Sequence, residues 1–213
     1  MSLAEYLSNC TPEELREKLL LLDKSLSELY THGYFLNGSL LSIKLGEEGE
    51  LSLESFQHLL EKVNLYDDIE DNNYDNGKKS NILELCVIGI CAYNNQNIMY
   101  AGSRDFFRNL LDNLELYLNN ESINERIDDD IKEYYRTTLN NFVNGKELDG
   151  MNSYLVNKNA AGKGNSNVRV YTKSTPIGRA LADKEAAFAN VLIIPSILVL
   201  IYLVLVIGYF LLK

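Results

Sequence analysis

The sequence is poor in the side chains that most often bind metals or act as nucleophiles, with three cysteines and two histidines among 213 residues. Cys10, Cys86 and Cys91 lack the spacing of metal ligands, so we expect reduced thiols that pack as small hydrophobic residues. His32 and His58 do not lie in an HExxH or similar frame, and we expect structural roles for both. These absences predict a protein without a metal centre, a cofactor or a histidine-based catalytic site.

A calcium-binding loop is also incomplete. Asp71, Asn73 and Asp75 have the 1-3-5 spacing of an EF-hand loop. Its sixth position is Asn76 rather than glycine, and its twelfth is Ile82 rather than glutamate. The sequence therefore lacks the residues that form the sharp turn and the bidentate ligand, and we interpret residues 67–79 as a solvated polar loop.

What the sequence does contain is one long apolar run. Residues 191–212 read VLIIPSILVLIYLVLVIGYFLL, without a charged side chain, and Lys213 follows. A helix of this length spans a hydrocarbon core of about 30 Å. The alternative, a buried core helix of a soluble protein, fits less well because the run is apolar on every face. We therefore predict that residues 191–213 are a single transmembrane tail anchor. Ser196 and Gly208 do not form a small-xxx-small pattern, so assembly through this segment has weak support.

Charge is segregated along the chain. Residues 158–213 contain seven basic and two acidic residues, a net charge of +5, and the whole chain carries −10, which leaves −15 for residues 1–157. We expect the acidic part to repel nucleic acid and to bind a basic protein partner. The basic residues Lys173, Arg179, Lys184 and Lys213 flank the predicted span and are expected to attract anionic lipid headgroups.

By the positive-inside rule, this basic flank places the N-terminal domain in the cytoplasm. The chain also has no N-terminal apolar segment of signal-peptide type, which agrees with that orientation. Three N-x-S/T sequons, at Asn9, Asn37 and Asn120, would be glycosylation candidates in a eukaryotic lumen. Sugar on Asn120 would overturn the predicted orientation.

The local patterns predict mostly helices. Thr11 and Pro12 form a strong helix start, and the leucine-rich helix that follows is expected to end at His32 and Gly33. Two short β-like pieces, 40–45 and 50–56, with a turn at 46–49, predict a hairpin. Further helices are expected over 80–93, 103–119, 124–143 and about 147–157, with Asp128–Asp130 near a helix start, a flexible linker over 158–176, and a helical lead at 177–190.

This order of elements resembles a degenerate C-terminal lobe of a protein kinase over residues 2–150. The leucine-rich helix ending in LYTHGY resembles the helix before the kinase "LHxxG" sequence. Leu36-Asn37-Gly38 then falls at the catalytic His-Arg-Asp, and Ser55-Phe56-Gln57 at Asp-Phe-Gly. Lys79-Ser80-Asn81-Ile82 resembles the "KSDI" start of the large C-lobe helix. The resemblance implies a mainly α fold with one small β-hairpin.

The departures from the kinase pattern imply that phosphoryl transfer is lost. Gly38 replaces the catalytic-base aspartate and Ser55 replaces the metal-binding aspartate. Phe56 keeps the phenylalanine of Asp-Phe-Gly, and Asn81 stands at the aspartate of "KSDI". The Gly-rich loop and the strand lysine are also missing, because the sequence has no N-terminal lobe. The resemblance therefore implies a pseudokinase remnant without enzymatic activity.

Two functional hypotheses follow. The first is a non-catalytic, tail-anchored adaptor or scaffold with an acidic cytosolic domain (residues 1–157), a basic flexible juxtamembrane segment (158–190) and the anchor (191–213). Its partners would be the lipid bilayer and a basic protein. The second is an enzyme, either a kinase-like nucleotide binder or an unrecognised membrane-surface enzyme. A cleft with convergent ionisable groups would favour the second.

Overall fold

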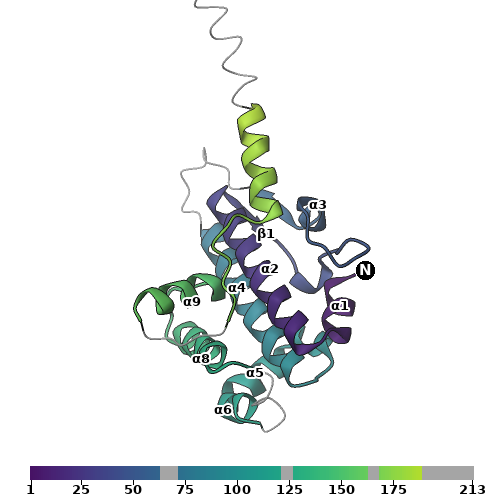
Figure 1. The fold of residues 1–213 in the computed structure, drawn as a ribbon. Helices are drawn as coiled ribbons and strands as arrows, with labels where there is room; N and C mark the ends of the chain where they lie inside the picture. The colour runs from purple at the N-terminus through teal and green to yellow at the C-terminus, as the bar shows by residue number, and fades with distance from the viewer. Residues whose placement is uncertain (63–71, 121–126, 163–167, 189–213) are drawn as a thin grey trace, which may run out of the picture.

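A computed structural model of the chain describes residues 1–62, 72–120, 127–162 and 168–188 (Figure 1). The described residues are mainly helical and include one two-stranded antiparallel sheet, so the predicted mainly α class with a small β element is confirmed. The predicted anchor, residues 191–213, lies outside the described residues. Among the helices that are described, none is long and apolar enough to cross a membrane.

Helix α2 (Pro12–Thr31) is the centre of the first half of the fold. It begins as predicted, because the Thr11 hydroxyl accepts a hydrogen bond from the Glu14 amide and Pro12 occupies the first turn. It ends at Thr31 with His32 as its C-cap, and Gly33 follows in the left-handed conformation with φ +73°. One face of α2 buries six leucines: Leu15, Leu19, Leu20, Leu22, Leu26 and Leu29. Helix α1 (Leu3–Asn9) precedes α2.

The small sheet is not the hairpin that the sequence predicts. Strand β1 (Tyr34–Leu36) pairs with β2 (Leu60–Lys62), and the segment between them contains the 3₁₀ helix η1 (Leu40–Ser42) and the short helix α3 (Leu53–Phe56). The predicted strands at 40–45 and 50–56 are therefore wrong, although the turn at 46–49 forms, with Gly49 at φ +77°.

Side-chain capping explains why these two pieces are not strands. The Ser39 hydroxyl accepts a hydrogen bond from the Leu41 amide and starts η1, and the Glu84 carboxylate accepts one from the Leu40 amide at 3.0 Å. Similarly, the Ser55 hydroxyl accepts a hydrogen bond from the Ser52 amide at 3.1 Å and stabilises the turn of α3. Such local bonds from serine compete with strand pairing.

Helix α4 (Asn72–Tyr93) is the second central helix and contacts α2, α8 (Asp129–Val143) and β1. It begins eight residues before the predicted start at residue 80. The prediction of a polar loop is therefore wrong for residues 72–79, while residues 67–71 lie outside the described residues. Asp75 of the incomplete calcium motif is part of the helix.

The remaining helices surround these two. They are η2 (Ile98–Gly102), α5 (Arg104–Asp112), α6 (Leu114–Leu118) and α9 (Met151–Ala160), in addition to α8. Asp128 is the N-cap of α8, which confirms the predicted helix start at Asp128–Asp130. Acidic residues are favourable there because they complement the helix dipole.

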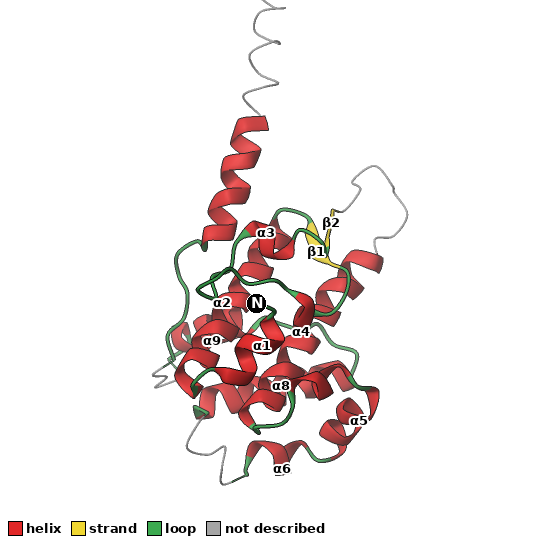
Figure 2. Cartoon of the chain, turned by 90° about the vertical axis from the view of Figure 1, so that its right-hand side faces the viewer, coloured by secondary structure: helices red, strands yellow, loops and turns green. Residues whose placement is uncertain are grey.

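The last described helix, residues 176–188, leaves the body of the molecule beside the end of α2 that carries His32 (Figures 1 and 2). Its first turns pack against the body, since Ile177 and Leu181 are buried, whereas residues 182–188 are exposed. This agrees with the helical lead that the sequence predicts at 177–190.

Candidate functional site

The kinase-like positions Gly38, Ser55 and Phe56 lie close together but form no charged site. A Cβ atom on Gly38 would lie 2.9 Å from Leu59, and the amide of Leu59 donates to the carbonyl of Phe56 at 2.8 Å. Ser55 is buried, and its hydroxyl accepts from the backbone of its own turn. Gly38, with φ +126°, adopts a backbone conformation that side chains rarely tolerate.

Asn81, the fourth kinase-like position, has a structural role. Its side chain is buried in α4, where its Oδ1 accepts from the Leu36 amide at 3.3 Å and from the Tyr30 hydroxyl at 3.2 Å. Its Nδ2 donates to the Leu36 carbonyl at 3.2 Å. Asn81 therefore holds strand β1 against the two central helices.

A cleft of about 710 Å³ between α8 and α9 is lined by seven charged side chains, a grouping that the sequence does not predict. Most of its charges are paired: Lys158 contacts Asp130 at 2.7 Å, Lys132 contacts Asp129 at 3.4 Å, and Arg136 contacts Glu133 at 3.6 Å. The i,i+3 spacing of the last two pairs is visible in the sequence. The Lys158–Asp130 pair joins segments that are distant in sequence, so it cannot be recognised from spacing.

The electrostatics of this cleft favour permanently charged groups. The hydrogen bond that Lys158 donates to Asp130 raises the pKa of Lys158, and those that Arg136 donates to Glu115 raise the pKa of Arg136. A general acid or base instead needs a pKa moved toward neutrality. The raised pKa of Lys158 fits an ion pair that joins α9 to α8, and neither shift moves its group toward neutrality.

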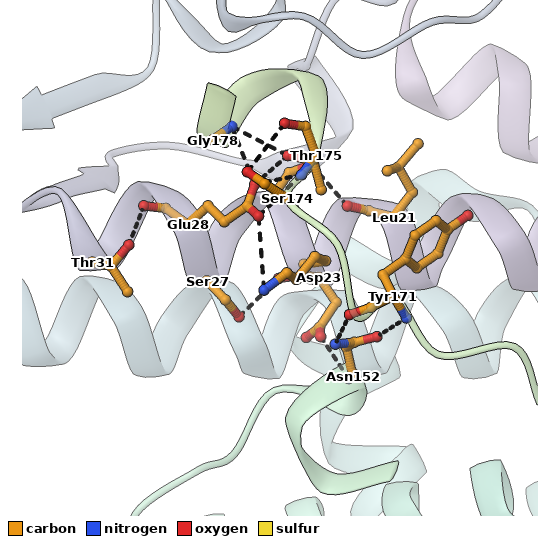
Figure 3. Close-up of polar contacts among 12 residues, drawn as sticks. Leu21, Asp23, Ser27, Glu28, Thr31, Asn152, Tyr171, Ser174, Thr175 and Gly178 are labelled. Carbon is orange, nitrogen blue, oxygen red and sulfur yellow. Dashed lines mark hydrogen bonds and ion pairs between the residues drawn. The ribbon is translucent and has the colours of Figure 1, made fainter. Parts of the chain in front are cut away.

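A buried polar site lies on α2, where two carboxylates each accept hydrogen bonds from the backbone of a segment much later in the sequence (Figure 3). The first is Asp23, whose oxygens accept hydrogen bonds from the amides of Met151 at 2.8 Å and Asn152 at 2.7 Å. These amides are the first of α9, whose own N-cap, Gly150, has no side chain. Asp23 therefore supplies the missing cap. Burial raises the pKa of Asp23 to about 6, against the opposing effect of these two hydrogen bonds.

The second carboxylate, Glu28, caps the 176–188 helix. It accepts hydrogen bonds from the amide of Thr175 at 3.0 Å, from the amide of Gly178 at 3.1 Å and from the hydroxyl of Thr175. Lys24 lies 3.7 Å from the same carboxylate. We call Glu28, Thr175 and Gly178 the Glu28 clamp. It holds the start of the 176–188 helix against α2.

Two further contacts extend this docking site. The side-chain amide of Asn152 in α9 exchanges two hydrogen bonds with the backbone of Tyr171, at 2.7 and 3.1 Å, as a neighbouring strand would. At the other end, His32 Nδ1 lies 2.9 Å from Glu185. Residues 168–181 are therefore docked against α2 and α9, which differs from the flexible linker predicted for 158–176.

The predicted membrane-flanking residues lie along this docked segment. Lys173 is exposed before the helix, and Arg179 and Lys184 are exposed on it. Lys213 lies outside the described residues. The three described cations are thus available to lipid headgroups or to another partner at the part of the molecule from which the 176–188 helix emerges (Figure 2).

Comparisons with protein-family models, with curated proteins and with solved structures find no match for this chain.

Sequence reasoning missed the clamp although one signal for it was present. Thr175-Pro176 repeats the Thr11-Pro12 pair that correctly marks the start of α2, and it marks the start of the 176–188 helix equally well. The roles of Asp23 and Glu28 carry no comparable signal, because their hydrogen-bond partners lie 128 and 147 positions away.

Proposed function

We propose that the protein is a non-catalytic adaptor, anchored in a membrane by residues 191–212, whose acidic domain is fixed to the helix that leads into the anchor. The observation that carries the proposal is the Glu28 clamp. It holds the start of a helix whose last described residue, Phe188, lies three residues before the apolar run begins.

Such docking has a consequence for an adaptor. A flexible linker would let the domain sample many orientations near the bilayer, whereas a docked helix limits them. Burial of Ile177 and Leu181 adds about 1.5–3 kcal/mol for each side chain. A fixed orientation presents the same face to every partner and reduces the entropy lost on binding.

The charge of the domain supports a basic partner. Glu13, Glu14 and Glu17 are exposed on the first turns of α2, and the Asp129 side chain at the start of α8 is 99% exposed. Exposed acids of this kind steer oppositely charged proteins and repel nucleic acid and anionic lipid. We therefore propose a basic protein as the partner of the cytosolic domain.

The absence of phosphoryl-transfer activity is part of the proposal. Its support is that Gly38 leaves no room for a side chain toward Leu59, and that the Ser55 hydroxyl is used within its own turn. For the alternative, an enzyme, the cleft between α8 and α9 is the candidate site. A thermal shift of the protein with Mg·ATP would favour that alternative.

Membrane attachment is tested by alkaline carbonate extraction of cells that express the full chain. We expect the protein in the membrane pellet, and we expect Leu200→Arg with Leu203→Arg to release it, because each arginine costs about 2.5–3.5 kcal/mol at a helix centre. The matched control places arginine at two exposed apolar residues of the domain, Leu116 and Val143, and should stay in the pellet. A wild-type protein in the soluble fraction would refute the proposal.

Orientation requires a separate measurement. In sealed membrane vesicles with the cytosolic side outward, added protease should digest the N-terminal domain. Glycosylation of Asn120, or full protection from protease, would contradict the cytosolic placement.

A further inference from the structure

We propose that Thr175 is a phosphorylation site for a proline-directed protein kinase, and that phosphate on this residue releases the 176–188 helix from α2. The inference rests on the proposed cytosolic placement, where ATP and protein kinases are available. It goes beyond that function because it makes the fixed orientation of the domain reversible.

The sequence around Thr175 has the form of a kinase substrate. Thr175 is followed by Pro176, the dipeptide that proline-directed kinases accept, and residues 168–175 form no helix or strand. Protein kinases bind substrates in extended form, so this stretch needs no unfolding once it is detached from α2. The hydroxyl attacks the γ-phosphorus of ATP, a P–O bond forms as ADP leaves, and the hydroxyl proton passes to the base of the kinase.

The Glu28 clamp has no room for a phosphate. The Thr175 hydroxyl donates to the Glu28 carboxylate, and Thr175 is only 3% exposed. On the other side, a Cβ atom on Gly178 would lie 2.4 Å from Glu28 Oε2 and 2.7 Å from the Ser174 hydroxyl. The Thr175 hydroxyl is therefore buried in a closely packed clamp, and a phosphoryl group added to it does not fit the docked position.

The negative charge of the phosphate, like its size, disfavours the docked position. A phosphothreonine carries about −1.5 to −2 at neutral pH, and it would lie against the negative carboxylate of Glu28. Lys24 is within 3.7 Å of that carboxylate, but one positive charge cannot balance both groups. The repulsion acts in a buried site, where charges are poorly screened.

Phosphate would nevertheless preserve the helix itself. Thr175 is the residue before the first helical position, and its hydroxyl accepts from the Gly178 amide at 3.3 Å. A phosphate there can accept hydrogen bonds from the first amides and complements the helix dipole. The phosphate thus replaces Glu28 as the cap. The expected product is a 176–188 segment that remains helical but has lost its contact with α2.

Burial of Thr175 also makes modification depend on docking. A kinase reaches the hydroxyl only when residues 168–178 have detached, so the rate of phosphorylation reports how often the clamp opens. Glu28→Gln weakens the clamp and should speed phosphorylation of Thr175 by about tenfold, the change expected for a weakened hydrogen bond to a charged group.

The experiment treats the full chain, in lipid nanodiscs, with a purified cyclin-dependent kinase and Mg·ATP. Mass spectrometry locates the phosphate, and hydrogen exchange follows residues 168–188. We expect phosphate on Thr175 and faster exchange of the amide hydrogens of residues 168–181, which contact the body. Helix content measured by circular dichroism should not change. A second preparation carries phosphothreonine at position 175 introduced during synthesis, which tests release without the kinase.

Three variants complete the design. Ser174→Ala keeps the site and should be phosphorylated as the wild type is, whereas Pro176→Ala should not. Glu13→Gln removes an exposed acid from the same helix and should leave the rate unchanged. A wild-type chain without phosphate on Thr175, or a phosphorylated chain with unchanged exchange, overturns the proposal. Carbonate extraction of the unmodified chain tests membrane attachment separately.

Discussion

Asp23 and Glu28 are two buried carboxylates of one helix, and each caps the start of a later helix, yet they hold different parts of the molecule. Asp23 is 2% exposed and binds two backbone amides of α9, which lies within the domain. Glu28 is 8% exposed, binds a threonine hydroxyl as well as amides, and has Lys24 beside it. Asp23 therefore links two helices within the domain, whereas Glu28 links the domain to the helix that leaves it.

The comparison shows that part of the acidity of this chain is structural. A carboxylate is the acceptor best suited to the unpaired amides at a helix start, and α2 uses it twice. Glu84 does the same for η1. The net charge alone therefore overstates the acidity available to a partner.

The pH dependence of stability should separate the two carboxylates most strongly. Burial raises the pKa of Asp23 from 3.8 to about 6, so between these values the folded protein binds more protons than the unfolded chain. The free energy of unfolding therefore falls by about 3 kcal/mol as pH rises from about 4 to 6, at about 1.4 kcal/mol per pH unit. Above pH 6 the contribution of Asp23 no longer changes. Urea unfolding of wild type and Asp23→Asn across this range measures the difference. Equal slopes for the two proteins would contradict the role of Asp23.

Removal of the Asp23 cap should have the next largest effect. Asp23→Ala leaves the two buried amides of α9 without their acceptor and should lower the free energy of unfolding by about 2 kcal/mol at pH 5. Glu13→Ala, on the exposed face of the same helix, should change it by less than about 0.5 kcal/mol. If both variants lose the same stability, Asp23 is not a cap.

Glu28→Gln should act locally rather than globally. Because its partners belong to the segment that leaves the domain, we expect the midpoint of urea unfolding to change little. The amides of residues 178–182 should exchange about tenfold faster, which lowers the free energy of local opening by about 1.4 kcal/mol. Hydrogen exchange with mass spectrometry resolves this segment. A large loss of global stability would show that the two carboxylates have the same role.

The glycines against the two carboxylates offer the smallest test. A Cβ atom would lie 2.7 Å from Asp23 at Gly150 and 2.4 Å from Glu28 at Gly178. Gly150→Ala should therefore reduce global stability by about 1 kcal/mol, and Gly178→Ala should chiefly loosen the 176–188 helix. Gly102, with no atom within 4 Å of its Cβ position, is the control. If Gly150→Ala and Gly178→Ala reduce global stability equally, Asp23 and Glu28 do not differ in the way proposed.

Local signals predicted much of the fold. Thr11-Pro12, the leucine stripe of α2 and the turn at 46–49 were readable because their interactions are short-range. The hairpin at 40–56 was wrong because serine caps and Glu84 stabilise helical turns in a sequence that alternates like a strand.

The docking site could not be predicted in the same way. Residues 158–176 have the composition of a linker, and the contacts that order residues 168–175 come from Asn152 and Glu28, both distant in sequence. The kinase-like resemblance remains a prediction, since its four positions perform structural tasks that a non-kinase fold needs as well.

The central claim, that the domain is docked rather than tethered, is tested most directly by a distance distribution. Spin labels at Glu13→Cys on α2 and Ala187→Cys on the 176–188 helix, in a full chain with Cys10→Ser reconstituted in nanodiscs, report this geometry by electron–electron double resonance. We predict a single narrow distribution that broadens when Glu28→Gln and Thr175→Val are combined. A broad, coil-like distribution in the chain that retains Glu28 and Thr175 would contradict the account.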